Sequence, residues 1–209
     1  MTKKFGSTTA LVQLALFSAI IILLAFTPFI GYIPLGFTKA TTIHIPVIIG
    51  SIILGPKRGA ILGFIFGLTS LINNTINPSI TSFVFTPFYS LGNAEGNFLS
   101  LIICFVPRIL VGVVPHYVYK ILKKFTSSTS LACILAGICG SLTKTILVMN
   151  MIYLYFGKAY SLAQGNAEGL LYSAILTVIL VNGVPEAIVA AIITTFVVKA
   201  IKSSRKGTL

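Results

Sequence analysis

Acidic residues are nearly missing from this 209-residue chain. Aspartate does not occur, and Glu95, Glu168 and Glu186 stand against 15 lysines and arginines, which gives a formal net charge of +12. Charged residues make up 9% of the sequence, whereas soluble domains average ~25%. Because hydrophobic residues reach 56%, a soluble fold would have too few polar side chains to cover its surface. The composition excludes a soluble domain, a disordered chain, a disulfide scaffold and a coiled coil, and predicts a polytopic membrane protein.

Motifs for catalysis and metal binding are also missing. The sequence contains no HExxH, no GxSxG, no paired aspartates and no P-loop for ATP. Cys104, Cys133 and Cys139 lie in apolar runs without a CxxC pair, and His44 and His116 stand alone. We therefore expect a protein that is not an enzyme and has no cofactor or metal, and the energy for any uphill transport must come from elsewhere. The basic residues lie between apolar runs, which argues against a nucleic-acid partner.

Apolar segments predict an all-α integral membrane protein, a bundle of six transmembrane helices in a single domain, 1–209. The segments cover residues 9–30, 42–54, 59–72, 98–122, 131–156 and 170–201. The second and third are short, since they reach only ~20 Å against a hydrocarbon core of ~30 Å. A re-entrant hairpin would place Lys57 and Arg58 inside the membrane, which is costly, so two short spans are favoured. Pro185 predicts a kink in the last helix.

The distribution of basic residues predicts the orientation of these helices. One side would collect eleven of them, while only Lys39 and Lys158 lie on the other. The eleven are Lys3, Lys4, Lys57, Arg58, Lys120, Lys123, Lys124, Lys199, Lys202, Arg205 and Lys206. Positive residues stay in the cytoplasm, so both termini are predicted to be cytoplasmic and segments 31–41, 73–97 and 157–169 to face outward. We expect a multi-pass protein of the plasma membrane.

Polar residues inside the predicted helices are the candidate substrate-binding residues. Arg108 lies ~15 Å deep by helical rise, and Lys144, Asn150, Asn182 and Glu186 lie within the last two segments. Such residues usually pair or line a cavity, and Glu186 is expected to form a structural ion pair with either cation. Two cations against one anion leave a surplus positive charge. That surplus predicts an anionic ligand, with a carboxylate as one candidate.

The outward segments resemble a lid over this polar interior. Segment 31–41 contains Thr38, and segment 73–89 contains Asn74 and Phe85, which we add to the candidate substrate-binding residues. Amides and aromatics above a polar pocket suit a small amphiphilic solute. Anchoring of the aromatics at the membrane surface is the alternative.

Small residues recur every four positions on three helices and allow close approach of backbones in lipid. Ala15 and Ala19 of the first segment predict contact with a separate subunit, with internal packing as the competing interpretation. The other two stripes predict internal packing: Gly59, Gly63 and Gly67, and Ala132, Ala136 and Gly140. No duplicated half is visible, which argues against the inverted-repeat plan of many secondary carriers.

Several stretches are similar to the substrate-binding S components of energy-coupling factor (ECF) vitamin transporters, in the branch associated with pantothenate. Beside the Ala-x-x-x-Ala pattern of the first helix, they are Ile33-Pro-Leu-Gly-Phe, Ile43-His-Ile-Pro-Val-Ile-Ile-Gly, Leu54-Gly-Pro-Lys-Arg-Gly-Ala, Thr81-Ser-Phe-Val-Phe-Thr-Pro-Phe, Val106-Pro-Arg-Ile-Leu and Asn182-Gly-Val-Pro-Glu-Ala. The resemblance covers nearly the whole chain.

The resemblance implies a vitamin-binding subunit of an ECF-type ABC importer. It would bind its vitamin from outside with high affinity, dock through its first three helices on a transmembrane coupling subunit, and topple to release the vitamin inward, driven by two ATPase subunits. Pantothenate is the expected ligand. Folate, a pyridoxine-like compound or a pyrimidine stay open as ligands, as does a stand-alone secondary carrier.

Overall fold

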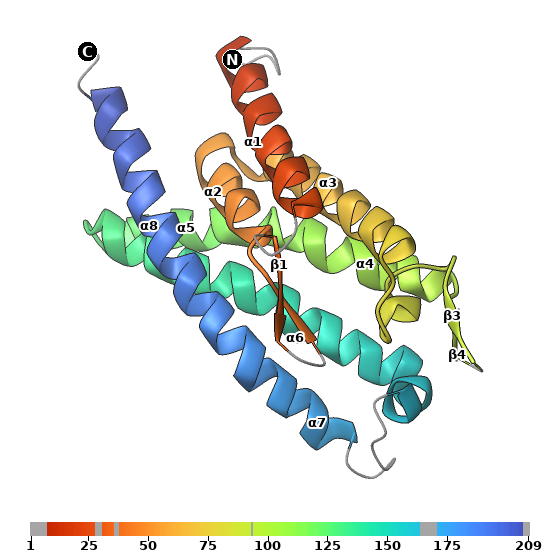
Figure 1. Ribbon diagram of the computed structural model, residues 1–209. Coiled ribbons are helices and arrows are strands. Elements are labelled where there is room, and N and C mark those ends of the chain that lie inside the picture. The colour runs from red at the N-terminus through yellow and green to blue at the C-terminus, as the bar shows by residue number, and fades with distance from the viewer. Residues whose placement is uncertain (1–7, 28–30, 36–37, 93, 164–170, 207–209) are drawn as a thin grey trace.

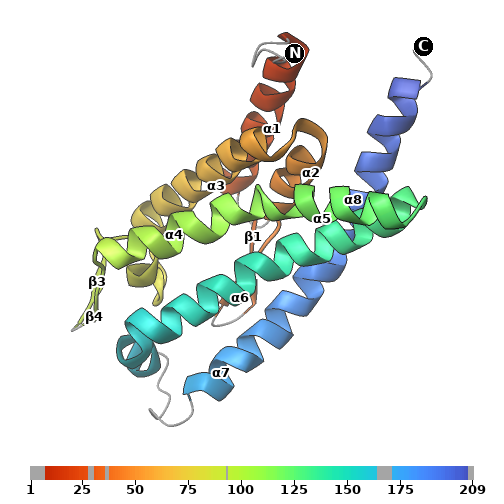
Figure 2. The same ribbon diagram turned by 180° about the vertical axis from the view of Figure 1, so that it is seen from behind.

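A computed structural model describes residues 8–27, 31–35, 38–92, 94–163 and 171–206, without the side chains of 32–40, 163 and 204–206. The described chain is almost entirely helical (Figures 1 and 2). Its helices are α1 (Thr8–Phe26), α2 (His44–Leu54), α3 (Pro56–Ile76), α4 (Phe98–Val111), α5 (Val114–Phe125), α6 (Thr129–Ala163), α7 (Leu171–Val178) and α8 (Val184–Lys206), with a 3-10 turn η1 (Ser82–Val84) and a π-helical turn η3 (Ile179–Gly183). Its short strands are β1 (Tyr32–Leu35), β2 (Thr38–Thr41), β3 (Ser90–Leu91) and β4 (Ala94–Glu95).

Five helical stretches are long and apolar enough to cross a membrane. They are Thr8–Phe26, Pro56–Ile76, Phe98–Phe125, Thr129–Leu162 and Leu171–Ser203. A lipid environment also accounts for the many large apolar side chains that face outward along these helices, such as Leu23 at 63% and Phe196 at 73% exposure. The chain is therefore an all-α membrane protein, as its composition predicts.

The third apolar segment is longer than predicted, whereas the second is short, as predicted. Gly55, whose φ is 91°, ends α2. Pro56 begins α3 at the first helical position, where a backbone N–H would have no partner within the helix, so its absence costs nothing. From there α3 runs for 21 residues and reaches spanning length, so the expectation of a short third helix is wrong. The polar residues after Ile72 continue the helix, and the side chains of Asn74 and Thr75 bond to carbonyls one turn back. By contrast α2 has 11 residues, nine of them buried in protein.

Two predicted single helices are interrupted locally, although each remains one stretch of spanning length. The segment 98–122 divides into α4 and α5 at Gly112 and Val113, with Pro115 in the first turn of α5. The segment 170–201 divides into α7 and α8 around η3, which ends two residues before Pro185. The kink predicted at Pro185 is thus a π-helical turn just before it, consistent with a proline that cannot donate to the preceding turn.

Close helix contacts follow the small-residue stripes of α3 and α6. A Cβ on Gly59 would lie 1.9 Å from the carbonyl oxygen of Gly112, and one on Gly63 would lie 2.3 Å from that of Arg108, so only glycine permits this approach of α3 to α4. On α6, Ala132 and Ala136 are fully buried. Internal packing of both stripes is confirmed.

The outward segments contain regular structure rather than simple loops. In segment 31–41, β1 and β2 form an antiparallel hairpin with Tyr32 opposite Thr41. In segment 73–97, η1 is followed by a second small hairpin of β3 and β4. Figures 1 and 2 place the β1–β2 hairpin near the middle of the bundle, between α8 and α4, and the β3–β4 hairpin at one edge.

Candidate functional site

A layer of buried polar residues separates two apolar cores, one around α2 and one beneath η1. On α6 the order along the chain is apolar Ala136, polar Lys144 and apolar Val148. An apolar–polar–apolar order recurs on α4 and from α7 to α8, and on α3 the polar residues follow the apolar Leu62 and Phe66. The buried polar members of this layer include Ser70, Arg108, Ser141, Lys144, Thr145, Asn182 and Glu186. Four helices thus bring their few polar side chains to one depth, where a solute could be held inside an otherwise apolar bundle.

Lys144 and Glu186 form a buried ion pair in this layer. The Lys144 Nζ lies 2.6 Å from the Glu186 Oε2, so of the two pairings considered from the sequence the structure contains this one. The pair also binds the end of β2. The Thr41 backbone N–H donates to the Glu186 Oε1 at 2.5 Å, and Lys144 donates to the Thr41 Oγ1 at 2.6 Å. Both charges are satisfied by these bonds, and the hairpin is fixed to α6 and α8.

Arg108 is buried on α4 without a carboxylate beside it in the described part of the chain. Its Nη1 donates to the carbonyl oxygen of Ile103 at 2.7 Å, and its Nη2 donates to the Ser70 Oγ at 3.3 Å. The guanidinium lies over the ring of Phe85 at 4.9 Å and that of Phe66 at 5.7 Å. These contacts are all neutral, so the positive charge of Arg108 is not balanced there.

A hydrogen-bond network extends from Arg108 towards η1. Asn74 donates from Nδ2 to the Ser70 carbonyl oxygen at 2.8 Å, and accepts at Oδ1 from the Ser82 hydroxyl at 2.9 Å. Ser70 therefore connects Asn74 to Arg108. The structure brings together three residues chosen from the sequence, Arg108, Asn74 and Phe85, although they come from three separate segments.

Other candidates lie elsewhere. Asn150 is exposed, and its Nδ2 donates to the carbonyl oxygen of Ile146 on its own helix, so it does not join the polar layer. Six residues of helix turn Asn150 ~120° away from Lys144, which puts it on a different face of α6. Its place on the exposed side of α6 does not support the expectation from the sequence that Asn150 binds substrate. Asn182 is buried in η3. Thr38 belongs to β2, but its side chain lies outside the described part.

Sequence reasoning missed Thr41 and His44. Thr41 gave no signal, because one threonine at the end of an outward segment is not distinctive. His44 is fully buried at the start of α2, with Lys144 and Glu186 as its charged neighbours. His44 could have been identified from the sequence, because it is a lone histidine at the start of an apolar run in a highly apolar protein.

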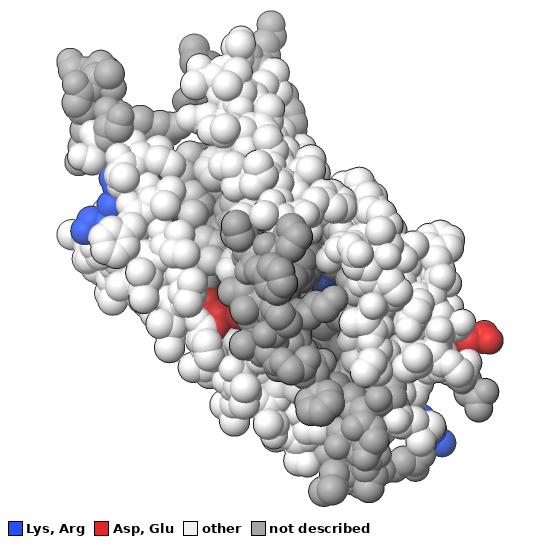
Figure 3. Space-filling view, viewed as in Figure 1, with Lys and Arg blue, Asp and Glu red and all other residues white. Residues whose placement is uncertain are grey.

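A hollow of about 530 Å³ lies at another place, near the kink that α6 makes at Phe156. It contains none of the candidate residues. Its lining residues are Tyr153, Leu154, Tyr155, Phe156, Gly157, Lys158, Ala159, Ser161 and Leu171. Charged atoms are sparse on the face shown in Figure 3. The few that are visible lie at the edges of this face and near its centre.

The exposed small residues of α1 contrast with those of α3. Ala15 and Ala19 are exposed, while Phe17, Ile21 and Ala25 form the buried face of α1. The interpretation of Ala15 and Ala19 as internal packing is therefore wrong.

Comparisons with known proteins agree with the resemblance. Residues 9–198 match the family described as "ECF transporter, substrate-specific component". The chain is 38% identical over 209 residues to the pantothenic acid transporter PanT of Lactococcus lactis subsp. cremoris (strain MG1363), across 99% of this chain and 100% of that protein. It is 37% identical over 115 residues to the pantothenate transporter PanT of Leuconostoc mesenteroides subsp. mesenteroides, across 52% of this chain and 50% of that protein. The chain therefore belongs to the family of ECF transporter substrate-specific components, as a multi-pass transport protein of the plasma membrane.

Proposed function

We propose that the chain is the high-affinity pantothenate-binding subunit of an ECF-type importer. It takes up the vitamin from outside and passes it inward while docked on a transmembrane coupling subunit that two ATPase subunits drive. The proposal is supported by the family match and by the names of both relatives.

The observation that carries the substrate proposal is the unbalanced charge of Arg108. A buried cation among neutral groups is costly unless an anion joins it. A guanidinium also presents parallel N–H donors that fit a carboxylate, and such charge-assisted bonds are the strong ones. Pantothenate carries one carboxylate, which would lie against Arg108. Its two hydroxyls and its amide would be bound by Asn74 and Asn182, with Phe85 covering the carboxylate end.

Lys144 has a different role in this proposal. Its charge is already balanced by Glu186, and both groups bind Thr41 at the base of the β1–β2 hairpin. The pair therefore positions the hairpin that carries Thr38, and Lys144 contacts the vitamin only at the edge of the site.

We further propose six membrane crossings with both termini in the cytoplasm. The lysine distribution supports this orientation. The start of α1 and the end of α8 lie at the same end of the molecule in both ribbon views, as an even number of crossings requires (Figures 1 and 2). The β1–β2 hairpin would complete the crossing made by α2, since the Thr41 backbone N–H at the end of β2 is bonded to Glu186.

Docking on the coupling subunit would use the exposed face of α1. Ala15 and Ala19 are exposed there, with Ser18 between them half-buried and donating to the Leu14 carbonyl oxygen of its own helix. Small side chains permit a second helix to approach closely in lipid.

Calorimetry of the purified protein tests the substrate proposal. We expect strong binding of pantothenate and much weaker binding of pantothenol, in which an alcohol replaces the carboxylate. Folate, pyridoxine and a thiamine-type pyrimidine serve as competing vitamins. Equal affinity for pantothenate and pantothenol would contradict the role of Arg108, and preference for another vitamin would contradict the ligand. Co-purification with ATPase subunits distinguishes this function from a stand-alone carrier.

A further inference from the structure

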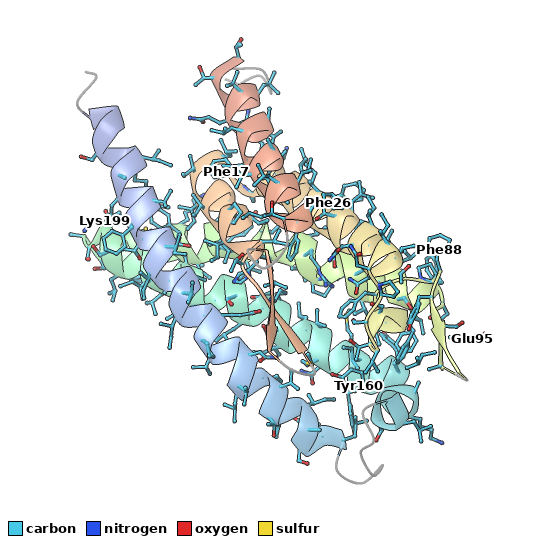
Figure 4. All side chains as sticks on the ribbon, in the orientation of Figure 1. Phe17, Phe26, Phe88, Glu95, Tyr160 and Lys199 are labelled. Carbon is cyan, nitrogen blue, oxygen red and sulfur yellow. The ribbon has the colours of Figure 1, made fainter. Side chains whose placement is uncertain are left out.

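Lysines from two helices converge where the ends of α5 and α8 meet the start of α6. The Lys202 ammonium of α8 donates to the Tyr119 hydroxyl of α5 and lies 4.2 Å from the centroid of that ring. Cys133 on α6 is buried beside them, and its charged neighbours in the described chain are Lys202, Lys199 and Lys123. Three cations therefore surround one small region of the bundle. Figure 4 shows Lys199 on α8 beside the end of α5.

No carboxylate among the described residues balances this cluster. Residues 96–167 and 187–209 contain no acid at all. Glu186 is bonded to Lys144, and Glu95 lies at the opposite edge of the molecule (Figure 4). The negative ends of α5 and α8 supply only about half a charge each. Lys123 donates to the Ser127 carbonyl oxygen at 2.9 Å, but an ammonium has three protons, so donors are left for another acceptor.

An exposed apolar surface adjoins Lys199 on α8. Phe196 and Ile192 lie three and seven residues before Lys199, hence on the same side of the helix, and are 73% and 52% exposed. Lysines next to an exposed apolar stripe at one end of a membrane bundle match a phospholipid, whose phosphate lies at the surface and whose chains lie along the helix.

We propose that the ends of α5 and α8 and the start of α6 bind the headgroup of an anionic phospholipid. Lys123, Lys199 and Lys202 hold its phosphate, Tyr119 positions Lys202, and Ile192 and Phe196 contact its acyl chains. The ligand class is an anionic lipid such as phosphatidylglycerol, and the site is separate from the vitamin site around Arg108.

Titration of the purified full-length chain in detergent tests the proposal. Short-chain phosphatidylglycerol is compared with short-chain phosphatidylcholine, and bound lipids are counted by native mass spectrometry. We expect selective retention of phosphatidylglycerol that weakens with added salt. Replacing Lys123, Lys199 and Lys202 together by Gln should lower its affinity about fivefold per lysine, hence roughly a hundredfold. The variant Lys57→Gln/Arg58→Gln is the matched control and should bind the lipid normally.

A further variant and a competition experiment distinguish the remaining outcomes. If the triple variant fails to fold, Lys199→Gln alone, which leaves the Lys202–Tyr119 contact intact, should still lower the affinity about fivefold. Sodium phosphate distinguishes a lipid from a free anion: displacement of phosphatidylglycerol by millimolar phosphate would overturn the lipid assignment. Equal affinity for both lipids, or an undiminished affinity in the lysine variants, would overturn the site itself.

Discussion

Lys144 and Arg108 are two cations buried in the same polar layer, but their surroundings differ. Lys144 lies 2.6 Å from a carboxylate oxygen, whereas Arg108 is bonded to a carbonyl oxygen and a hydroxyl beneath an aromatic ring. The first charge is balanced within the protein and the second is not. Burial alone therefore does not distinguish the two cations. The absence of a carboxylate around Arg108 in the described chain does, and for this reason we propose Arg108 as the ligand-binding charge.

The largest effect is expected for Glu186→Gln, which removes the partner of Lys144. An unpaired buried charge typically costs about 3–5 kcal/mol, so thermal unfolding in detergent should begin at a much lower temperature. The double variant Lys144→Met/Glu186→Met removes both charges and should recover most of that stability. If Glu186→Gln is as stable as the parent protein, Lys144 is not held by this pair.

Arg108→Gln should mainly change ligand binding. Loss of one charge-assisted hydrogen bond costs roughly 1.5–3 kcal/mol, which is a 10- to 150-fold loss in pantothenate affinity by calorimetry. Affinity for pantothenol should hardly change, since it has no carboxylate to lose. Asn150→Ala, on the outer face of α6, is the control and should bind normally. If Arg108→Gln folds poorly but binds pantothenate with unchanged affinity, Arg108 has a structural role, as Lys144 does.

A Gly63→Ala variant tests whether the position of Arg108 matters. The new Cβ would lie 2.3 Å from the Arg108 carbonyl oxygen, so α4 must move away from α3. We expect a destabilisation of about 1–3 kcal/mol together with weaker pantothenate binding. Normal binding in a destabilised variant would show that the site tolerates displacement of α4.

Thr41→Val removes the hydroxyl that Lys144 donates to but keeps the shape of the side chain. The backbone bond to Glu186 stays, so the β1–β2 hairpin should exchange its amide hydrogens roughly tenfold faster without unfolding the bundle.

Bound pantothenate should slow exchange in segments 31–41 and 73–89. Equal protection with and without the vitamin would mean that neither segment acts as a lid.

The smallest effect on the isolated protein is expected for Ala15→Trp or Ala19→Trp, since neither residue is near either cation. Folding and vitamin binding should be unchanged, because the face is exposed. Assembly with the coupling subunit and uptake by cells should be lost. Normal uptake in both variants would refute docking through this face.

Much of this description could be predicted from local features of the chain. The apolar runs and the scarcity of acids are enough to establish a helical membrane protein, and short motifs such as Val106-Pro-Arg indicate the family. Arg108, Asn74 and Phe85 were chosen from the sequence as substrate-binding candidates, and the structure places them close together. Helix interruptions at Gly112 and η3 were less predictable, because they depend on how neighbouring helices pack.

Which charged and polar residues pair inside the bundle depends instead on the tertiary structure. Lys144 and Glu186 are 42 residues apart, and Thr41 and Glu186 are 145 apart, so their contacts depend on how α6 and α8 are rotated about their axes and on where the hairpin ends. A sequence counts two cations and one anion but does not show which cation the anion meets. Likewise, small residues repeat every four positions on both α1 and α3, yet only the packed structure buries one stripe and exposes the other. Composition and periodicity are properties of the chain alone, whereas charge pairing and burial depend on distances between segments that folding creates.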